Sequence, residues 1–379
     1  MKKIIFGIVV VIVVIAVISL ATKSDEKFVT SMEPIKIAFI GPLSGDGAAW
    51  GEIEKNTIGL AVDEINKAGG VKGRQIDVKY EDGKCEGPTA LSAAKKLVEV
   101  DHIKILLISC SQEILPIAPY ANQNKVIALT SYASASQITN AGEYIFRNSY
   151  NNHDMAKAMA DLAIKKGATA AIITEQSSFA ADLGNLFVDE AFPAVKGKVV
   201  ANESFEQGVK DYRSQATKIM ATNPKVIILN PTSPATGIAL LKQFRQLGYK
   251  GPFVGNFFGG SREVEALTEA QGMIYVSDPV FTESPLKQKV FADYEKIYGK
   301  TPDLSWPVGA RYDAVYILKQ AFETVGDDPT AVKDYLHNLP TDFTGILGTY
   351  RFNKDNADIT NIKPSIAEIK GGKSVVVQQ

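Results

Sequence analysis

The side chains that most often perform catalysis or bind metal ions are few in this sequence and lie far apart. Histidine occurs as His102, His153 and His337, and cysteine as Cys85 and Cys110. Zinc sites use such residues in close pairs, a few positions apart. The spacing therefore argues against a metal enzyme, and we expect no metal, no other cofactor and no catalytic residue.

A glycine-rich segment follows the first apolar run and is only superficially similar to a phosphate-binding loop. Residues 41–47 read Gly-Pro-Leu-Ser-Gly-Asp-Gly, without the spacing of a dinucleotide-binding or P-loop motif. Pro42 also removes a backbone N–H that a pyrophosphate would use. Because the sequence lacks a G-x-S-x-G nucleophile elbow as well, it favours a binding protein. An exported α/β enzyme with dispersed catalytic residues is the alternative.

The length and charge of the chain narrow the class of protein further. Its 379 residues are 45% hydrophobic and 22% charged, which is enough for about two to three domains with buried cores. Lys and Arg number 41 against 42 Asp and Glu, for a net charge of -1. Nucleic-acid-binding domains normally carry a basic surplus, so we expect no nucleic-acid partner.

The N-terminal segment has the pattern of an export signal. Lys2 and Lys3 precede an apolar or small run over residues 4–21, and a polar linker follows over residues 22–33. The run of 18 residues is at the lower limit for a membrane span, so a cleaved signal peptide over residues 1–21 and an uncleaved signal anchor both remain open. In either case the positive-inside rule places the rest of the chain outside the cytoplasm, in the periplasm or at the cell surface.

Export changes the interpretation of the two cysteines. In an oxidising compartment the simplest expectation is one disulfide between Cys85 and Cys110, with two unpaired buried thiols as the alternative. The bond would close a loop of about 25 residues and stabilise the fold by about 3 kcal/mol in the chain-entropy estimate.

Short strands and amphipathic helices alternate along the chain from residue 34. Strands are expected at 35–40, 75–80, 104–109 and 126–129, with helices at 50–67, 88–99 and 113–122 between them. The same alternation restarts near residue 152 and runs to a strand at 273–277. Two helices at 285–298 and 307–324 and two strand-like segments at 346–352 and 363–377 follow. This pattern predicts two doubly wound α/β lobes with parallel sheets.

Several motifs together are similar to one family. They are Ile37-Ala38-Phe39-Ile40-Gly41-Pro42-Leu43-Ser44-Gly45, the segment 61–73 (AVDEINKAGGVKG), the cysteine-containing segments 80–85 and 109–111, and the late segments 312–315 and 352–356. They resemble the leucine/isoleucine/valine-binding protein family, the type I periplasmic solute-binding components of ABC transporters. The resemblance covers nearly all of the chain from residue 34, and its N-terminal motifs are the most specific.

The resemblance implies two lobes joined by a three-stranded hinge. Lobe 1 would comprise residues 34–149 and 281–343, and lobe 2 residues 150–280 and 344–379. The chain would cross between them near 148–151, 278–282 and 343–346. A monomer would close around a small solute and deliver it to an ABC-transporter permease; a membrane-anchored sensor is the alternative, with residues 4–21 holding it to the membrane.

The resemblance also implies a set of ligand-binding residues. Ser111 falls at the position of a carboxylate clamp, before a helix whose N-terminus favours an anion. Tyr132 and Ser134 fall where the ligand's amino and carboxylate groups are contacted, and Trp50 and Phe179 where aromatic rings close over it. Ordinary packing of these two rings and a simple helix N-cap at Ser111 are the alternatives. The complete set is Trp50, Ser111, Tyr132, Ser134, Phe179, Thr232 and Phe257.

One position departs from the pattern of the family's amino-acid binders. They place an acidic residue, which neutralises the ligand's ammonium group, where this sequence has Phe257. A buried ammonium without a counter-charge is costly. Either another acid, Glu113, Glu175 or Asp278, replaces it, or the ligand lacks an ammonium group. We therefore expect a branched-chain or other hydrophobic amino acid, or else a small organic acid.

Overall fold

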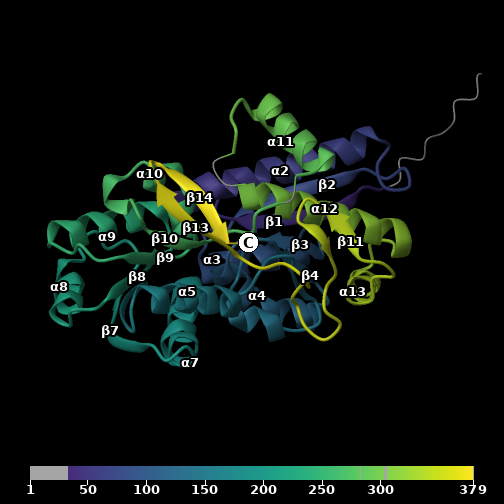
Figure 1. Ribbon diagram of the computed structural model, residues 1–379. Coiled ribbons are helices and arrows are strands. Elements are labelled where there is room, and N and C mark those ends of the chain that lie inside the picture. The colour runs from purple at the N-terminus through teal and green to yellow at the C-terminus, as the bar shows by residue number, and fades with distance from the viewer. Residues whose placement is uncertain (1–32, 282, 303–304, 379) are drawn as a thin grey trace, which may run out of the picture. The chain divides into compact units, whose positions relative to one another are not determined.

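Five short apolar strands pair in parallel to form the first β-sheet, in the order β2-β1-β3-β4-β5 (Figure 1). The strands are Ile35–Gly41 (β1), Ile76–Asp82 (β2), Ile105–Ile108 (β3), Ile127–Thr130 (β4) and Ile145–Arg147 (β5). Helices cover both faces, which is why β3 and β4 are buried along their whole length. One face packs against Ala48–Lys67 (α2), Ser305–Val325 (α12) and Pro329–His337 (α13), and the other against Gly87–Glu99 (α3) and Ser111–Asn124 (α4).

The second sheet has seven strands in the order β14-β13-β10-β9-β8-β6-β7, of which β13 and β14 run antiparallel to their neighbours. They are Thr169–Glu175 (β6), Lys198–Phe205 (β7), Val226–Asn230 (β8), Phe253–Gly255 (β9), Ile274–Ser277 (β10), Ser365–Lys370 (β13) and Lys373–Gln378 (β14). Asn152–Lys166 (α5), Ser178–Asn185 (α6) and Phe192–Ala194 (α7) pack on one face, and Arg213–Ala221 (α8), Pro234–Gln246 (α9) and Arg262–Glu265 (α10) on the other. A π-helical turn, Leu186–Ala191, separates α6 from α7.

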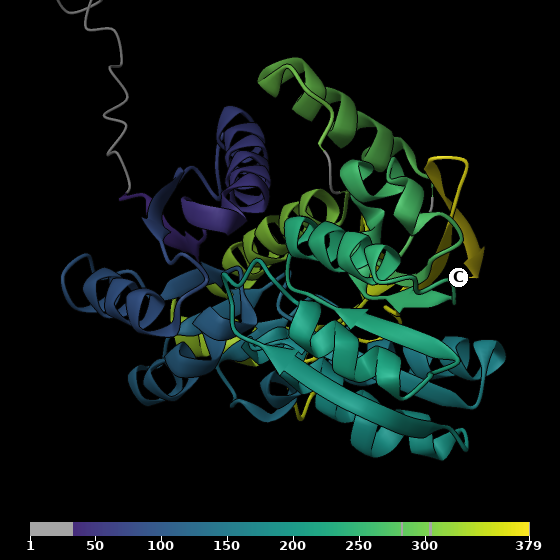
Figure 2. The same cartoon turned by 90° about the vertical axis from the view of Figure 1, so that its left-hand side faces the viewer.

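The two sheets lie side by side in Figure 1, and the second sheet comes to the front in Figure 2. After β10 the chain returns through Pro285–Tyr298 (α11) to α12, which packs against α2 of the first sheet. A fully buried ion pair, Arg311 to Glu54 at 2.6 Å, ties α12 to α2. The predicted fold class, two doubly wound α/β lobes, is therefore confirmed, and the late helices pack on the first lobe.

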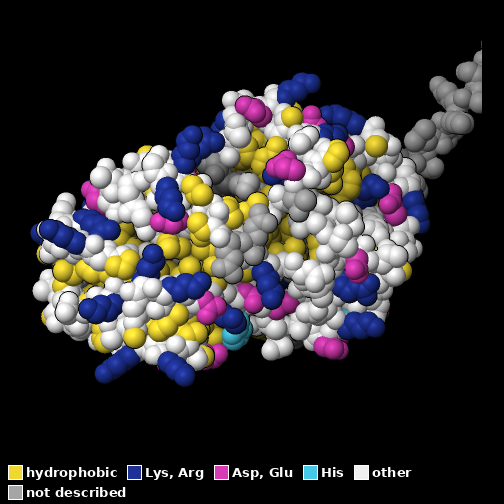
Figure 3. All heavy atoms as spheres, in the orientation of Figure 1, with side chains coloured by type: hydrophobic (Ala, Val, Ile, Leu, Met, Phe, Trp, Pro, Cys, Tyr) yellow, Lys and Arg dark blue, Asp and Glu magenta, His cyan; other side chains and the backbone are white. Residues whose placement is uncertain are grey.

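The computed structural model describes residues 33–281, 283–302 and 305–378. The expected signal peptide or anchor, residues 4–21, and the linker up to residue 32 lie outside these described residues. Among the residues that are described, no helix is both long and apolar enough to cross a membrane. Lys and Arg side chains are interspersed with Asp and Glu on the face drawn in Figure 3, in line with the near-zero net charge.

The segment after α13 makes several contacts with the elements around the first sheet. The hairpin Phe343–Gly345 (β11) and Gly348–Tyr350 (β12) is anchored by Asp313 of α12, whose carboxylate accepts the backbone N–H groups of Ile346 and Leu347 at 2.8 and 2.9 Å. Asp358 then pairs with the buried Arg147 at the end of β5. The hairpin and Asp358 therefore contact elements of the first lobe, and the crossing near 343–346 stays a prediction. The lobe boundaries themselves stay a prediction.

The three connecting segments are joined by side-chain hydrogen bonds. Tyr150 Oη donates to Asp278 Oδ1 at 2.6 Å, and the backbone N–H of Val280 donates to Ser365 Oγ at 3.1 Å. Burial raises the pKa of Asp278 to about 6, although the bond from Tyr150 opposes this shift. The acid at 278 is therefore part of the hinge and is already engaged there.

Candidate functional site

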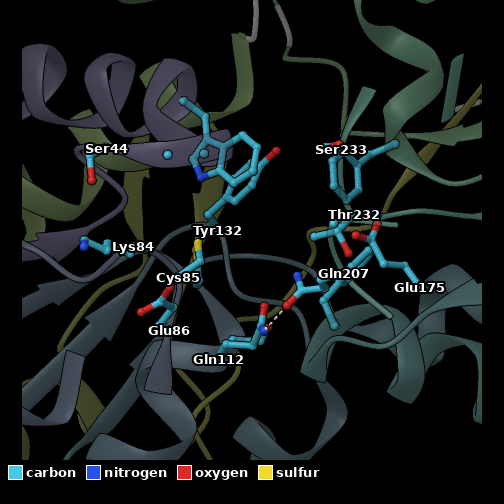
Figure 4. Close-up of a pocket in the computed structure, with 18 residues that line it drawn as sticks. Ser44, Lys84, Cys85, Glu86, Gln112, Tyr132, Glu175, Gln207, Thr232 and Ser233 are labelled. Atoms are coloured by element: carbon cyan, nitrogen blue, oxygen red, sulfur yellow. Dashed lines mark hydrogen bonds between the residues drawn. A yellow bond between two sulfur atoms is a disulfide. The ribbon is translucent and has the colours of Figure 1, made fainter. Parts of the chain in front are cut away.

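Loops that follow the carboxyl ends of the strands in both sheets meet at a cavity of about 270 Å³ (Figure 4). Parallel strands end at the same edge of a sheet, so the segments after them gather in one place. The first sheet contributes Ser44, Trp50, Lys84, Cys85, Glu86, Cys110, Ser111, Gln112 and Tyr132, and the second contributes Glu175, Phe179, Gln207, Gly208, Thr232, Ser233 and Phe257. We call these two sets the first wall and the second wall.

The first wall is held by a disulfide and by two carboxylates, of which Asp82 is the first. Cys85 and Cys110 are bonded, which confirms the expected pairing, and both line the cavity. Asp82, at the end of β2, accepts hydrogen bonds from Ser44 Oγ at 2.5 Å and from the backbone N–H groups of Leu43 and Lys84 at 2.9 and 3.1 Å. Although desolvation opposes the shift, these bonds lower the pKa of Asp82. The carboxylate thus fixes two loops of the first wall together.

Glu113 binds the backbone of both cysteines of the disulfide. Its carboxylate is fully buried and accepts the backbone N–H groups of Cys110 at 2.9 Å and Cys85 at 3.1 Å. Gly83 makes room for it, because a Cβ there would come within 2.2 Å of Glu113 Oε1. Burial raises the pKa of Glu113 to about 8, despite these two bonds. Glu113 is therefore a structural group of the first wall and does not line the cavity.

Ser111 begins α4 and lies on the cavity wall. The helix is 14 residues long, and its N-terminus carries unpaired backbone N–H groups and a partial positive charge. Ser111 Oγ accepts the backbone N–H of Ala135 at 3.2 Å, a role that leaves the hydroxyl hydrogen available to a ligand. Together these groups can bind a carboxylate.

Four aromatic rings run across the cavity from one wall to the other. Trp50 stacks on Tyr132 with ring centroids 6.3 Å apart, Tyr132 meets Phe257 edge-on at 6.0 Å, and Phe257 contacts Phe179 at 5.2 Å. Apolar parts of a ligand would find extensive contact area here. Phe257 thus belongs to an aromatic surface rather than to a charged site.

Six of the seven expected ligand-binding residues line this one cavity, and Ser134 does not. After Tyr132 the chain turns away, and Ser134 is buried with 3% of its surface exposed. Its carbonyl oxygen accepts the backbone N–H of Asn152 at 2.8 Å, at the start of α5. This bond joins the first lobe to α5, and the expected contact of Ser134 with a ligand stays a prediction.

Glu175 is the acidic residue of the second wall. It ends β6, only 5% of its surface is exposed, and it lines the cavity. Its Oε2 accepts the backbone N–H of Thr232 at 2.6 Å, while Thr232 Oγ1 donates to Ser177 Oγ at 3.1 Å. Strands β6 and β8 are neighbours in the sheet, which brings these residues together. Of the three acids considered as ammonium partners, Glu175 is the one on the cavity wall.

Sequence reasoning missed the polar residues at the rim of the cavity. One pair of them spans the two walls, because Gln112 Nε2 donates to Gln207 Oε1 at 3.3 Å (dashed in Figure 4). Their position directly after strand ends was the signal that could have found them. The missed polar lining residues are Lys84, Glu86, Gln112, Gln207 and Ser233.

Two sheets that present their carboxyl edges to one shared cavity define a bilobal solute-binding protein. The chain matches the family of periplasmic binding proteins over residues 34–373 and belongs to that family. This confirms the relationship that the sequence motifs indicated.

Individual relatives are similar over most of their length. The leucine-, isoleucine-, valine-, threonine- and alanine-binding protein of Pseudomonas aeruginosa is 27% identical over 327 residues, which are 83% of this chain and 86% of the relative. A branched-chain amino acid transporter substrate-binding protein from Streptococcus pneumoniae, solved with isoleucine, is 24% identical, with a TM-score of 0.78 and coverage of 91% and 100%. A solute-binding protein from R. palustris, solved with benzoate, is 22% identical, with a TM-score of 0.77 and coverage of 91% and 96%.

Proposed function

We propose that this protein is an extracytoplasmic receptor that binds a hydrophobic α-amino acid between its two walls and delivers it to an ABC-transporter permease. The observation that carries the proposal is the placement of Ser111 and Glu175 on opposite walls of the same cavity. One group suits a carboxylate and the other suits an ammonium group. The two charged groups of an amino acid would therefore each find a partner.

The carboxylate would bind at the N-terminus of α4. The hydroxyl of Ser111 and the first backbone N–H groups of this helix favour an anion at that point. The disulfide and the buried Glu113 hold the start of the helix in place before a ligand arrives. Such preorganisation reduces the conformational entropy lost on binding.

The ammonium group would bind to Glu175 in place of the acid that is missing at Phe257. A buried charge left without a partner costs several kcal/mol, so an amino acid needs an acid within reach. Glu113 and Asp278 are engaged beneath the disulfide and at the hinge, respectively. Glu175 is already oriented by the N–H of Thr232, which fixes the carboxylate near the cavity.

The side chain of the ligand would lie on the aromatic surface that spans the cleft. Because Trp50 and Tyr132 belong to one wall and Phe179 and Phe257 to the other, a ligand that contacts both pairs favours closure of the walls around it. A permease that recognises only the closed form would then distinguish loaded from empty receptor. The relatives named above, which bind branched-chain amino acids or benzoate, support a small carboxylate-bearing ligand.

The test is calorimetric titration of purified protein, freed of bound ligand, with hydrophobic amino acids and with the matching carboxylic acids. We expect saturable binding of amino acids, with the ligand recovered chemically unchanged by mass spectrometry. Binding only of acids that lack an amino group would show that Glu175 does not replace the missing acid. Chemical conversion of a ligand would favour the alternative, an exported α/β enzyme. Absence of binding by every ligand tested would contradict the proposal.

A further inference from the structure

A second cavity of about 460 Å³ lies next to the first. Four residues line both cavities, namely Trp50, Tyr132, Ser233 and Phe257. The rings of Trp50, Tyr132 and Phe257 therefore form a boundary that is common to the two spaces. A chain of atoms lying along these rings would pass from one cavity into the other.

Of the ten additional residues that line the second cavity, five are apolar, three are charged, and Thr236 and Ser261 are uncharged and polar. Both lobes contribute to it, through α2 on one side and through the start of α9 and the segment after β9 on the other. Its charged residues, by contrast, are exposed to solvent, so they do not impose a buried charge on an occupant. The apolar lining residues are Ala49, Ile53, Pro234, Ala235 and Phe258, and the charged ones are Lys210, Arg262 and Glu263.

The shared boundary also contains two buried polar atoms without a hydrogen-bond partner among the described residues. They are Trp50 Nε1 and Tyr132 Oη. Buried polar groups are almost always paired in folded proteins. The indole N–H of a tryptophan ligand could donate to Tyr132 Oη, whereas the side chain of leucine has no polar group. The side chain of 4-phenylphenylalanine has none either, so its expected gain rests on apolar burial alone.

The two volumes indicate the size of ligand that the cleft accepts. Ligand cavities typically measure about 300–1,000 Å³, and the first cavity, at about 270 Å³, lies just below that range. The second cavity is the larger of the two. An amino acid the size of leucine would occupy the first cavity and leave the second without an apolar occupant.

We propose that the second cavity is a subsite for an extended apolar arm, so that the preferred ligands are amino acids with side chains longer than that of leucine, such as tryptophan or 4-phenylphenylalanine. This inference rests on the proposed function, because the head group is taken to bind between Ser111 and Glu175. The arm would lie along Trp50 and Phe257 and end between Ala49 and Ala235, which belong to opposite lobes.

The test compares leucine, tryptophan and 4-phenylphenylalanine by calorimetry on the full chain and two variants. Burial of a further ring contributes about 1.5–3 kcal/mol, so we expect at least about tenfold tighter binding of the longest ligand than of leucine. Ala235→Phe and Ala49→Phe each place a ring in the second cavity at an exposed helix position. Either change should weaken the binding of 4-phenylphenylalanine at least about tenfold more than the binding of leucine. Ala221→Phe, at an exposed position of α8 that lines neither cavity, is the control.

The outcomes separate this inference from the proposed function. If leucine binds tightest and both substitutions weaken all three ligands equally, the second cavity is not a subsite, although the receptor remains. If one variant fails to fold, the relative affinities of the three ligands for the unsubstituted protein and for the other variant still test whether the second cavity is a subsite. If no ligand in the series binds at all, the proposed function fails together with this inference.

Discussion

The two walls of the cleft are built differently. In the first wall, a disulfide, the buried Glu113 and the hydrogen-bonded Asp82 fix the loops after β2 and β3. In the second wall Glu175 accepts the N–H of Thr232 and Thr232 donates to Ser177, without a disulfide, and aromatic rings supply much of the remaining surface. The first wall is thus cross-linked covalently, whereas hydrogen bonds and aromatic packing hold the second.

This difference suggests a division of roles between the walls. Every amino acid and every carboxylic acid has a carboxylate, so a rigid site for that group can serve all of them. The ammonium group and the side chain vary among candidate ligands. The group that would recognise the ammonium, Glu175, lies on the second wall, together with Phe179 and Phe257, two of the four rings that would contact the side chain. Changes in the first wall should therefore affect stability and general affinity, and changes in the second should affect selectivity.

The largest effect on stability is expected from the disulfide. Replacing Cys85 and Cys110 together by serine should lower the free energy of unfolding by about 3 kcal/mol, because the bond restricts the unfolded chain. Denaturant titration followed by circular dichroism would measure this. Reductant should destabilise the natural protein to a similar extent and leave the double variant unchanged. An unchanged unfolding midpoint in the double variant would show that the disulfide does not brace the first wall.

Ser111→Ala should weaken the binding of every ligand that carries a carboxylate. A hydrogen bond to a charged group contributes about 1.5–3 kcal/mol, so we expect roughly 10- to 100-fold weaker binding. Leucine and its des-amino analogue, 4-methylpentanoate, should lose affinity equally, whereas leucinamide, which has no carboxylate, should be nearly unaffected. Calorimetry with the three ligands tests this, and an equal loss for leucinamide would show that Ser111 does not bind the carboxylate.

Glu113 should make the stability of the first wall depend on pH. Burial raises its pKa from 4.5 to about 8 in the folded protein, so between these values the folded chain keeps a proton that the unfolded chain releases. Its contribution to the free energy of unfolding therefore decreases as pH rises through this interval. Glu113→Gln cannot titrate and should remove that decrease, as denaturant titrations at pH 5 and pH 8 would show.

Glu206→Gln, at an exposed position, is the matched control for this pH comparison and should leave the slope unchanged. Glu113→Gln should also lower the free energy of unfolding at pH 5 by about 1 kcal/mol, because the amide NH2 cannot accept one of the two backbone N–H bonds. An identical pH dependence in Glu113→Gln and the natural protein would contradict the assignment.

The smallest effect is expected at the rim. Gln207→Ala removes the hydrogen bond of 3.3 Å that joins the two walls through Gln112. Exposed hydrogen bonds contribute little, so affinity should fall less than about threefold, mainly through faster ligand dissociation. Stopped-flow fluorescence of the tryptophans would measure this rate. A loss greater than about tenfold would mean that the rim, rather than the aromatic surface, holds the walls together.

Much of the fold could be predicted because the strands and helices have clear periodicity. Short elements were missed, such as β5, which has three residues, and the helix that begins at Pro329 behind an Asp328 N-cap. Residues 178–194 are continuously helical but include the π-helical turn Leu186–Ala191, which the hydrophobic pattern does not reveal.

The site was predictable where it follows directly from strand ends. Ser111, Tyr132 and Thr232 each come just after a strand of a parallel sheet and therefore reach the cavity. The contact between Glu175 and Thr232 could not be predicted from their separation of 57 residues, because it depends on β6 and β8 being neighbours in the sheet. Lys84 and Gln207 also follow strand ends, but no periodicity in the loops shows that their side chains face the cavity.

The central claim is that Glu175 binds the ammonium group of an amino acid whose carboxylate lies at Ser111. The most direct test is to titrate the natural protein and Glu175→Gln with the tightest-binding hydrophobic amino acid and with its des-amino analogue. Breaking a buried charge pair costs about 3–5 kcal/mol, so the variant should bind the amino acid about 100-fold more weakly or worse and the analogue equally well. Glu86→Gln, an exposed residue of the same cavity, is the control. Equal losses for both ligands, or no loss for either, would contradict the claim.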